Sequence, residues 1–210
     1  MNKVYKVFPG GKFKVLTFSY DDGKIEDRRL VKLFNKFNLK ATFNLNTGII
    51  DPAIRIPQEE WPELYKGHDI AVHTFTHPTM IRLNDYNALR EILDDKDNLE
   101  KIFKRPIYGL AYPNGSYDNR IVDIAKSVGI KYARVTNDKY AATKAAEAYA
   151  ANADGPMLIG DENGFSMPED YMCWVPTCHH NHNLIDFGKK FMALTKKQYL
   201  YMMYVWGHSF

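Results

Sequence analysis

Two histidines in the sequence, His73 and His77, stand four positions apart. On a turn of helix this spacing puts both imidazoles on one face, within reach of a single ion. Earlier in the chain, Asp21 and Asp22 precede Gly23. A carboxylate and two imidazoles form a donor set that leaves coordination positions open for water, as a catalytic metal site requires. In the alternative interpretation, the aspartates form a turn and a helix cap, and the histidines are ordinary polar loop residues.

The hydrophobic pattern around these residues alternates between short strands and amphipathic helices. It predicts strands at 14–19, 41–45, 69–73, 107–112, 131–135, 172–178 and 199–206, and helices at 25–37, 85–103, 119–128 and 184–194. Strands that alternate with helices in this way pair in parallel and form an α/β fold. About seven strands are fewer than the eight of a closed (β/α) barrel, so we expect an irregular or incompletely closed barrel.

Polar side chains follow each predicted strand at its carboxyl end. They are Asp21 and Asp22, then Asn46, His73 and His77, the stretch from Tyr112 to Gly115, Arg134, His179 and His180, and finally His208. In barrels and open α/β sheets the loops at this edge converge on one site. We therefore expect these residues to become neighbours. Of the pair Asn44 and Asn46, the second lies nearer the end of its strand and is the better candidate for a hydrogen bond there.

Composition places the chain among globular proteins. Its 210 residues, of which 45% are hydrophobic and 25% charged, are enough for one well-filled core. We expect a single domain over residues 1–210. The regular pattern breaks at about 136–170, where an alanine-rich stretch, 141–153, predicts an insertion with a short helix. The chain ends at Phe210 on strand and loop residues, which favours a truncated C-terminus.

Charge and hydropathy argue against several classes of partner. The formal net charge of +3 is spread along the chain without a dense basic block, so a nucleic-acid partner is not expected. The first 14 residues carry four lysines and no apolar run long enough for a signal peptide or a membrane span. As written, the chain is expected to be soluble and cytoplasmic. A secreted protein whose signal has been removed would look the same, and the oligomeric state stays open.

Four segments resemble the motifs of a known family. Residues 17–23 (TFSYDDG) and 73–78 (HTFTHP) are similar to the first two motifs of the polysaccharide deacetylases, also called the NodB homology domain or carbohydrate esterase family 4. Residues 111–115 (AYPNG) resemble the third motif, and 205–208 (VWGH) the final one. The resemblance covers nearly the whole chain, and it implies a distorted, incompletely closed (β/α)7 barrel.

The resemblance also implies a reaction, the removal of acetyl groups from a carbohydrate by N- or O-deacetylation. It makes Asp22, His73 and His77 the ligands of one divalent metal ion, with zinc as the first choice and cobalt, nickel or manganese as alternatives. It makes Asp21 the base and His208 the acid. Zinc lowers the pKa of a bound water to about 7, so the base has only to accept a proton from a water already acidified.

Further residues are implied at the acyl group. By the same resemblance, a backbone N–H at Asn114, just after Pro113, stabilises the charge that develops on the carbonyl oxygen. Tyr112 and Trp206 are candidates for an acetyl- or sugar-binding surface, and the alternative is that both aromatic rings pack in the core.

At Ala111 the chain departs from the family pattern. Most members have an arginine there, in the third motif, and it orients the base. Arg134, at the end of the following strand, is a candidate replacement and otherwise a solvated charge at a strand end. The departure leaves open how Asp21 is held and which acyl compound is the substrate.

Two alternatives concern other functions. The histidines of residues 178–182 (CHHNH) form a second metal site in one interpretation and contact substrate or pack in the core in the other. Strand alternation allows only one of His179 and His180 to point toward the main site. The rivals to carbohydrate deacetylation are hydrolysis of a small non-sugar amide and a carbohydrate-binding module without catalysis.

Overall fold

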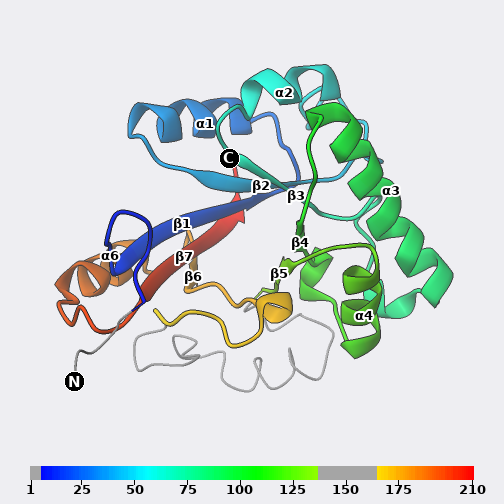
Figure 1. The fold of residues 1–210 in the computed structure, drawn as a ribbon. Coiled ribbons are helices and arrows are strands. Elements are labelled where there is room, and N and C mark those ends of the chain that lie inside the picture. Colours follow the sequence, from blue (N-terminus) through cyan, green and yellow to red (C-terminus); the bar gives the residue numbers. More distant parts are fainter. Residues whose placement is uncertain (1–5, 137–164) are drawn as a thin grey trace.

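Seven parallel strands form one curled sheet in the described part of the chain (Figure 1). The structure is a computed structural model, and it describes residues 6–136 and 165–210. The strands are β1 (Lys14–Asp21), β2 (Ala41–Leu45), β3 (Asp69–Val72), β4 (Gly109–Ala111), β5 (Tyr132–Arg134), β6 (Cys178–His179) and β7 (Tyr201–His208). Their order in the sheet is β5-β4-β3-β2-β1-β7-β6. Because all pairs are parallel, the carboxyl ends of the strands share one edge.

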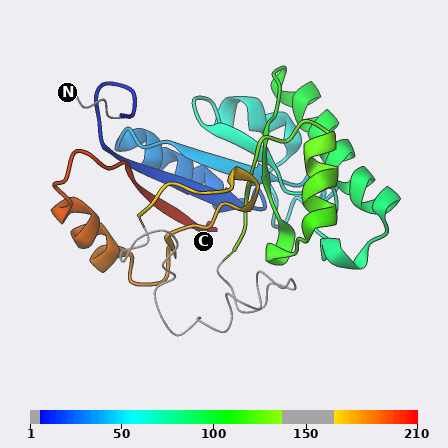
Figure 2. The same cartoon turned by 60° about the horizontal axis from the view of Figure 1, so that its bottom comes forward.

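Helices cover the outside of this sheet (Figure 1, Figure 2). They are α1 (Asp27–Lys36), α2 (Trp61–Leu64), α3 (Asp85–Phe103), α4 (Asn119–Ser127) and α6 (Leu184–Ala193). Side chains define the start of two of them: Asn84 accepts a hydrogen bond from the N–H of Asn87 at α3, and Asp118 accepts one from Ile121 at α4. Helix α6 lies at the β6–β7 end of the sheet, and α3 and α4 lie at the opposite end.

The curled sheet does not close into a complete barrel. Strands β5 and β6 are its two ends, and a single parallel bridge between Arg134 and Trp174 links β5 to the segment before β6. In this bridge the Trp174 N–H donates to the carbonyl of Ala133 at 2.8 Å, and the Val135 N–H donates to the carbonyl of Trp174 at 3.0 Å. The predicted distorted, incompletely closed (β/α)7 barrel is therefore confirmed.

The strand predicted at 172–178 is wrong. Residues Tyr171–Cys173 form a 3-10 turn, and only Cys178–His179 pair with β7. Asp170 starts the turn, because its side chain accepts a hydrogen bond from the N–H of Met172 at 2.8 Å. Pro176 then removes a donor from the segment, so a continuous ladder cannot form across it.

The other predicted elements agree with the structure more closely. Strand β2 and helix α3 match their predicted bounds, and the remaining strands and helices differ by at most two residues at each end. The short helix α2 was not predicted. The helix predicted at 141–153 lies outside the described residues. No helix in the described ranges is long and apolar enough to cross a membrane.

Gly48 provides a test of packing between the loops at the carboxyl edge. A Cβ atom at this position would lie 2.5 Å from the carbonyl oxygen of Phe75, which is main chain and cannot move aside cheaply. We expect Gly48→Ala to lower the free energy of unfolding by about 1–3 kcal/mol, measured by urea denaturation. Gly188→Ala is the matched control, because a Cβ there meets nothing within 4 Å inside α6. The free energy of unfolding of that variant should rise by about 0.5–1 kcal/mol. Equal effects of both substitutions would contradict the packing explanation.

Candidate functional site

Three side chains from two loops converge at the carboxyl edge of the sheet. Asp22 follows β1, and His73 and His77 follow β3. The Nε2 atoms of His73 and His77 lie 3.8 and 4.0 Å from Oδ1 of Asp22, and one ligand atom of each residue lies within 4.8 Å of the others. Because zinc bonds to nitrogen and oxygen are about 2.0–2.2 Å long, one ion between these atoms reaches all three.

Two of these atoms have no hydrogen-bond partner within the described chain. Oδ1 of Asp22 and Nε2 of His73 are both buried and unpaired. The other ring nitrogen of His73, Nδ1, lies 2.8 Å from the carbonyl of Ala111 and donates to it, so the lone pair is left on Nε2. Burial lowers the pKa of His73 to about 4, which keeps the imidazole neutral at physiological pH. The residues therefore fit a divalent metal ion.

The two histidines are brought together by a loop and not by the predicted helical turn. Thr74 and His77 have φ angles of 66° and 59°, which a helix does not contain. The side-chain amide of Asn46 donates to the carbonyls of His73 and Thr74 at 2.5 and 2.9 Å and holds this left-handed bend. The imidazole rings end 4.8 Å apart, centroid to centroid. The four-residue spacing thus correctly predicts that the two imidazoles lie close together, but the helical turn expected from it is replaced by a loop.

Arg134 pairs with Asp21 inside the curled sheet. Its Nη2 atom lies 2.7 and 2.5 Å from the two carboxylate oxygens, and both side chains are almost fully buried. Asn44 adds a donor at 2.7 Å from Oδ1 of Asp21. Burial alone would raise the pKa of Asp21, but the charge of Arg134, with smaller contributions from His73, His208 and Asn44, lowers it to about 2. Asp21 is therefore ionised at neutral pH.

Arg55 contacts Asp22 from the loop after β2. Its guanidinium donates to the main-chain carbonyl of Asp22, and its Nη1 lies 3.5 Å from Oδ2 of the same residue. The Nζ of Lys24 lies 3.9 Å from that oxygen. Sequence analysis did not single out Arg55 because the loop that carries it has no motif. Asn44 on β2 and Asn46 directly after it both take part in the site, although the sequence favours only Asn46.

His208 lies beside the same carboxylate. Its Nε2 is 3.8 Å from Oδ2 of Asp22, and about a third of its side chain is exposed. Trp206, two residues earlier, is buried and lies between Arg134 and His179, with the guanidinium 4.7 Å and the imidazole 4.8 Å from its ring. Trp206 thus packs in the interior and holds Arg134 in place.

His179 and His180 do not point in opposite directions, as strand alternation would predict, because β6 ends at His179 and His180 lies beyond it; their ring centroids are 4.5 Å apart. His179 packs against Trp206, whereas Nδ1 of His180 lies 3.1 Å from the hydroxyl of Tyr20. Within residues 6–136 and 165–210, the set Asp22, His73 and His77 is the group of possible ligands that lies close enough to hold an ion. The histidines at 178–182 do not form a second such group there.

The predicted third motif contacts the candidate metal ligand His73 through its first residue. Ala111 accepts the hydrogen bond from His73, and Pro113 is buried behind it. Tyr112 is 1% exposed and stacks on Tyr117 with ring centroids 5.1 Å apart, so it packs in the core. Asn114 is exposed with a φ of 56°, and its N–H has no hydrogen-bond partner among the described residues.

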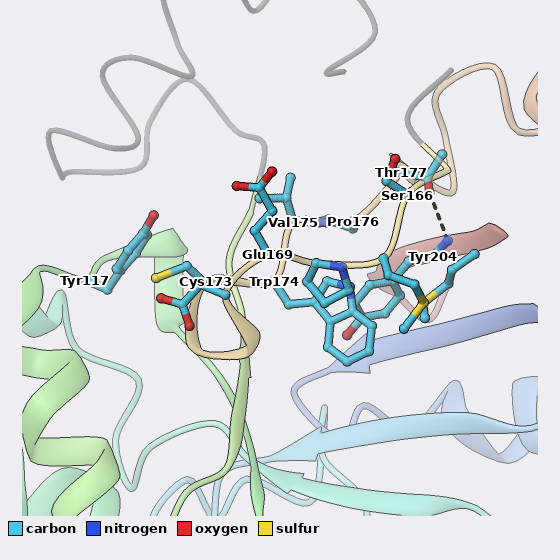
Figure 3. Close-up of a pocket in the computed structure, with 13 residues that line it drawn as sticks. Tyr117, Ser166, Glu169, Cys173, Trp174, Val175, Pro176, Thr177 and Tyr204 are labelled. Carbon is cyan, nitrogen blue, oxygen red and sulfur yellow. Dashed lines mark hydrogen bonds between the residues drawn. The ribbon is translucent and has the colours of Figure 1, made fainter. Parts of the chain in front are cut away.

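A separate cavity of about 180 Å³ is lined by Trp174 and lies at the seam between β5 and β6 (Figure 3). The rings of Trp174 and Tyr204 lie 5.3 Å apart in its wall, and Cys173 and Glu169 line it near the seam. None of the lining residues is among the three metal-ligand candidates. This cavity is therefore distinct from the site at the carboxyl edge.

Replacing Arg134 should show how far the stability of the fold depends on pairing the buried carboxylate of Asp21. Arg134→Gln leaves the carboxylate of Asp21 buried without a cation, and we expect the free energy of unfolding to fall by about 3–5 kcal/mol at pH 7. Urea denaturation measures this loss. Arg134→Lys keeps the charge but not the planar guanidinium, and it should recover part of the stability. Wild-type stability in Arg134→Gln would contradict the importance of the pair.

The same pair predicts a dependence of stability on pH. The folded-state pKa of Asp21, about 2, lies below the value of about 3.9 in an unfolded chain. The stabilisation is therefore fully present above about pH 4 and is lost as the pH falls through about 2. Measured without metal, the stability difference between wild type and Asp21→Asn should shrink over this range. A constant difference between pH 6 and pH 2 would rule out the depressed pKa.

Comparison with known proteins places the chain in a family. The sequence profile described as polysaccharide deacetylase matches residues 9–133. No curated protein sequence matches the chain significantly. Among solved structures, the Streptococcus pyogenes deacetylase PplD, in complex with acetate, is 27% identical, with 62% of this chain and 58% of that chain covered and a TM-score of 0.58.

Two further solved structures share the fold. The polysaccharide deacetylase BC0361 from Bacillus cereus is 23% identical, with 56% of this chain and 39% of that chain covered and a TM-score of 0.52. The peptidoglycan deacetylase PdaC from Bacillus subtilis is 16% identical, with 93% and 89% covered and a TM-score of 0.50. The chain spans less than two thirds of the length of PplD and of BC0361. Since the profile match covers more than half of the sequence, the chain belongs to the polysaccharide deacetylase family, a family of hydrolases.

Proposed function

We propose that this protein is a metal-dependent deacetylase that hydrolyses acetyl groups on a carbohydrate. The observation that carries the proposal is the convergence of unpaired ligand atoms of Asp22 and His73, with His77 beside them, next to the buried Asp21–Arg134 pair. A purely structural turn would leave no reason for two buried polar atoms without partners at 3.8 Å from each other.

The proposed ligands are Asp22, His73 and His77, with zinc as the first choice of ion. Two imidazoles and a carboxylate suit zinc and its neighbours among the divalent metals, and three protein ligands leave room for water and substrate. An ion bound there supplies a Lewis acid that polarises the acyl carbonyl and acidifies water. The neutral state of His73, set by its burial and by the hydrogen bond to Ala111, favours this ligand role.

Asp21 is proposed as the general base. Its carboxylate lies 3.8 Å from Nε2 of His73, so it borders the ligand set without belonging to it. Arg134 and Asn44 fix the orientation of the carboxylate, as the missing arginine of the third motif would. A carboxylate with a pKa of about 2 is a weak base, and it therefore suits a reaction in which the attacking water is already acidified.

The leaving group and the developing oxyanion have candidate partners on the same edge. His208 is partly exposed beside Asp22 and is proposed to protonate the departing amine or alkoxide. The unpaired N–H of Asn114 is proposed to donate to the carbonyl oxygen as charge develops on it. Hydrolysis then consumes one water, breaks the bond between the acyl carbon and the nitrogen or oxygen, and yields acetate and the free amine or hydroxyl.

Acetate release from a panel of N- and O-acetylated oligosaccharides tests this function. The panel includes peptidoglycan fragments because PdaC is a peptidoglycan deacetylase. With zinc or cobalt added, wild type should release acetate and His73→Ala should not. Asp21→Asn should lose about 10²–10⁴-fold in kcat while the metal stays bound.

His182→Ala is the matched control, since it removes an exposed histidine outside the ligand set and should keep wild-type turnover. Metal-bound wild type that releases acetate from no carbohydrate would refute carbohydrate deacetylation, and turnover on small amides would then favour an amidohydrolase. Undiminished turnover in Asp21→Asn would remove Asp21 from the role of base.

A further inference from the structure

Asp95 occupies a position on α3 where the helix pattern calls for an apolar residue. The buried stripe of this helix consists of Ala88, Ile92, Asp95 and Leu99, and Asp95 is 0% exposed. No cation among the described residues pairs with it, and its burial, with a smaller contribution from the like charge of Glu91, raises the pKa of Asp95 to about 8. A buried carboxylate without a cation is costly, so its retention needs a specific reason.

The two oxygens of Asp95 bind the main chain of two loops at the carboxyl edge. Oδ1 accepts a hydrogen bond from the N–H of Thr47, after β2, at 2.7 Å. Oδ2 accepts one from the N–H of His73 at 3.0 Å, and that N–H is shared with the carbonyl of Leu45 in the strand ladder. Asp95 therefore links the main chain of His73, a proposed metal ligand, to the neighbouring loop at Thr47.

Glu91 lies one helical turn before Asp95 and holds the other part of the same loop. Its carboxylate accepts hydrogen bonds from the N–H and the hydroxyl of Thr76 at 2.8 and 2.6 Å. Residues four apart on a helix share one face, so α3 presents two carboxylates side by side to the segment between the two histidines. These contacts replace the regular hydrogen bonds that a helical turn would have supplied.

We propose that Asp95, supported by Glu91, is a positioning residue for the metal site. It fixes the peptide of His73, so that the imidazole keeps its direction toward Asp22 without help from the metal. The inference rests on the proposed function of this site. Both oxygens of Asp95 accept from N–H groups, whereas asparagine would turn an NH2 group toward one of them.

The test compares two buried helix aspartates in the full chain. Asp95→Asn should weaken cobalt binding by about 10–100-fold, because it loosens the residue that carries a ligand. Chelator competition measures the affinity, and the visible absorption of bound Co²⁺, which depends on ligand geometry, should also change. Asp27→Asn is the matched control. Asp27 is also 0% exposed, but its carboxylate accepts from the hydroxyl of Tyr65 and not from the loop at residues 73–77. It should keep the wild-type spectrum.

The outcomes separate the inference from the proposed function. If wild type binds no Co²⁺, the metal site fails and the inference with it. If wild type binds Co²⁺ and Asp95→Asn does so with the same affinity and spectrum, only the inference is overturned. Equal losses in both aspartate variants would indicate a general effect of replacing a buried carboxyl group and would also overturn it. Should Asp95→Asn not fold, the part-buried Glu91→Gln gives the same readout, with an expected loss of about 10-fold.

Discussion

The ion pair between Asp21 and Arg134 crosses the interior of the curled sheet. Strand β1 carries the aspartate and β5 the arginine, and β2, β3 and β4 lie between them in the described sheet. Two charges buried this deeply are tolerated only when they neutralise each other and their hydrogen bonds are made. The sheet therefore has to curl far enough for the ends of β1 and β5 to meet, and Trp206 packs on the guanidinium from β7. The pair therefore stabilises the curvature of the sheet that brings the other strand ends together at the carboxyl edge.

That curvature is what turns separate strand ends into one site. Strand β1 sits between β2 and β7, so Asp22 has the β3 histidines on one side and His208 on the other. Each loop is also held by side chains with no part in the proposed chemistry. Asn46 bends the histidine loop, and Arg55 binds the carbonyl of Asp22. The loops are thus fixed by polar contacts to the scaffold, which explains how irregular backbone can keep ligand atoms in register.

Strand periodicity and the parallel order predict the fold and the meeting of Asp22, His73 and His77, because together they place strand ends on one edge of the sheet. These patterns are insufficient for the local backbone. A spacing of four does not distinguish a helical turn from the left-handed loop at His73–His77. The apolar run around Pro176 favours a strand, although the proline interrupts the hydrogen-bond ladder. The sequence allows two interpretations of Arg134, because pairing across a barrel depends on the curvature of the sheet. Asp95 had a signal, a carboxylate in an apolar stripe, that was missed within an otherwise regular helix.

Asp21 and Asp22 are adjacent in the chain but have different surroundings. Asp21 ends β1 in extended backbone, and its oxygens are occupied by Arg134 and Asn44. Asp22 has a φ of 85°, which turns its side chain out of the strand and leaves Oδ1 unpaired beside His73. Few residues other than glycine accept such a φ, and aspartate and asparagine are among them. A single left-handed residue therefore divides two identical side chains, so that one is saturated by the scaffold and the other is open to a ligand.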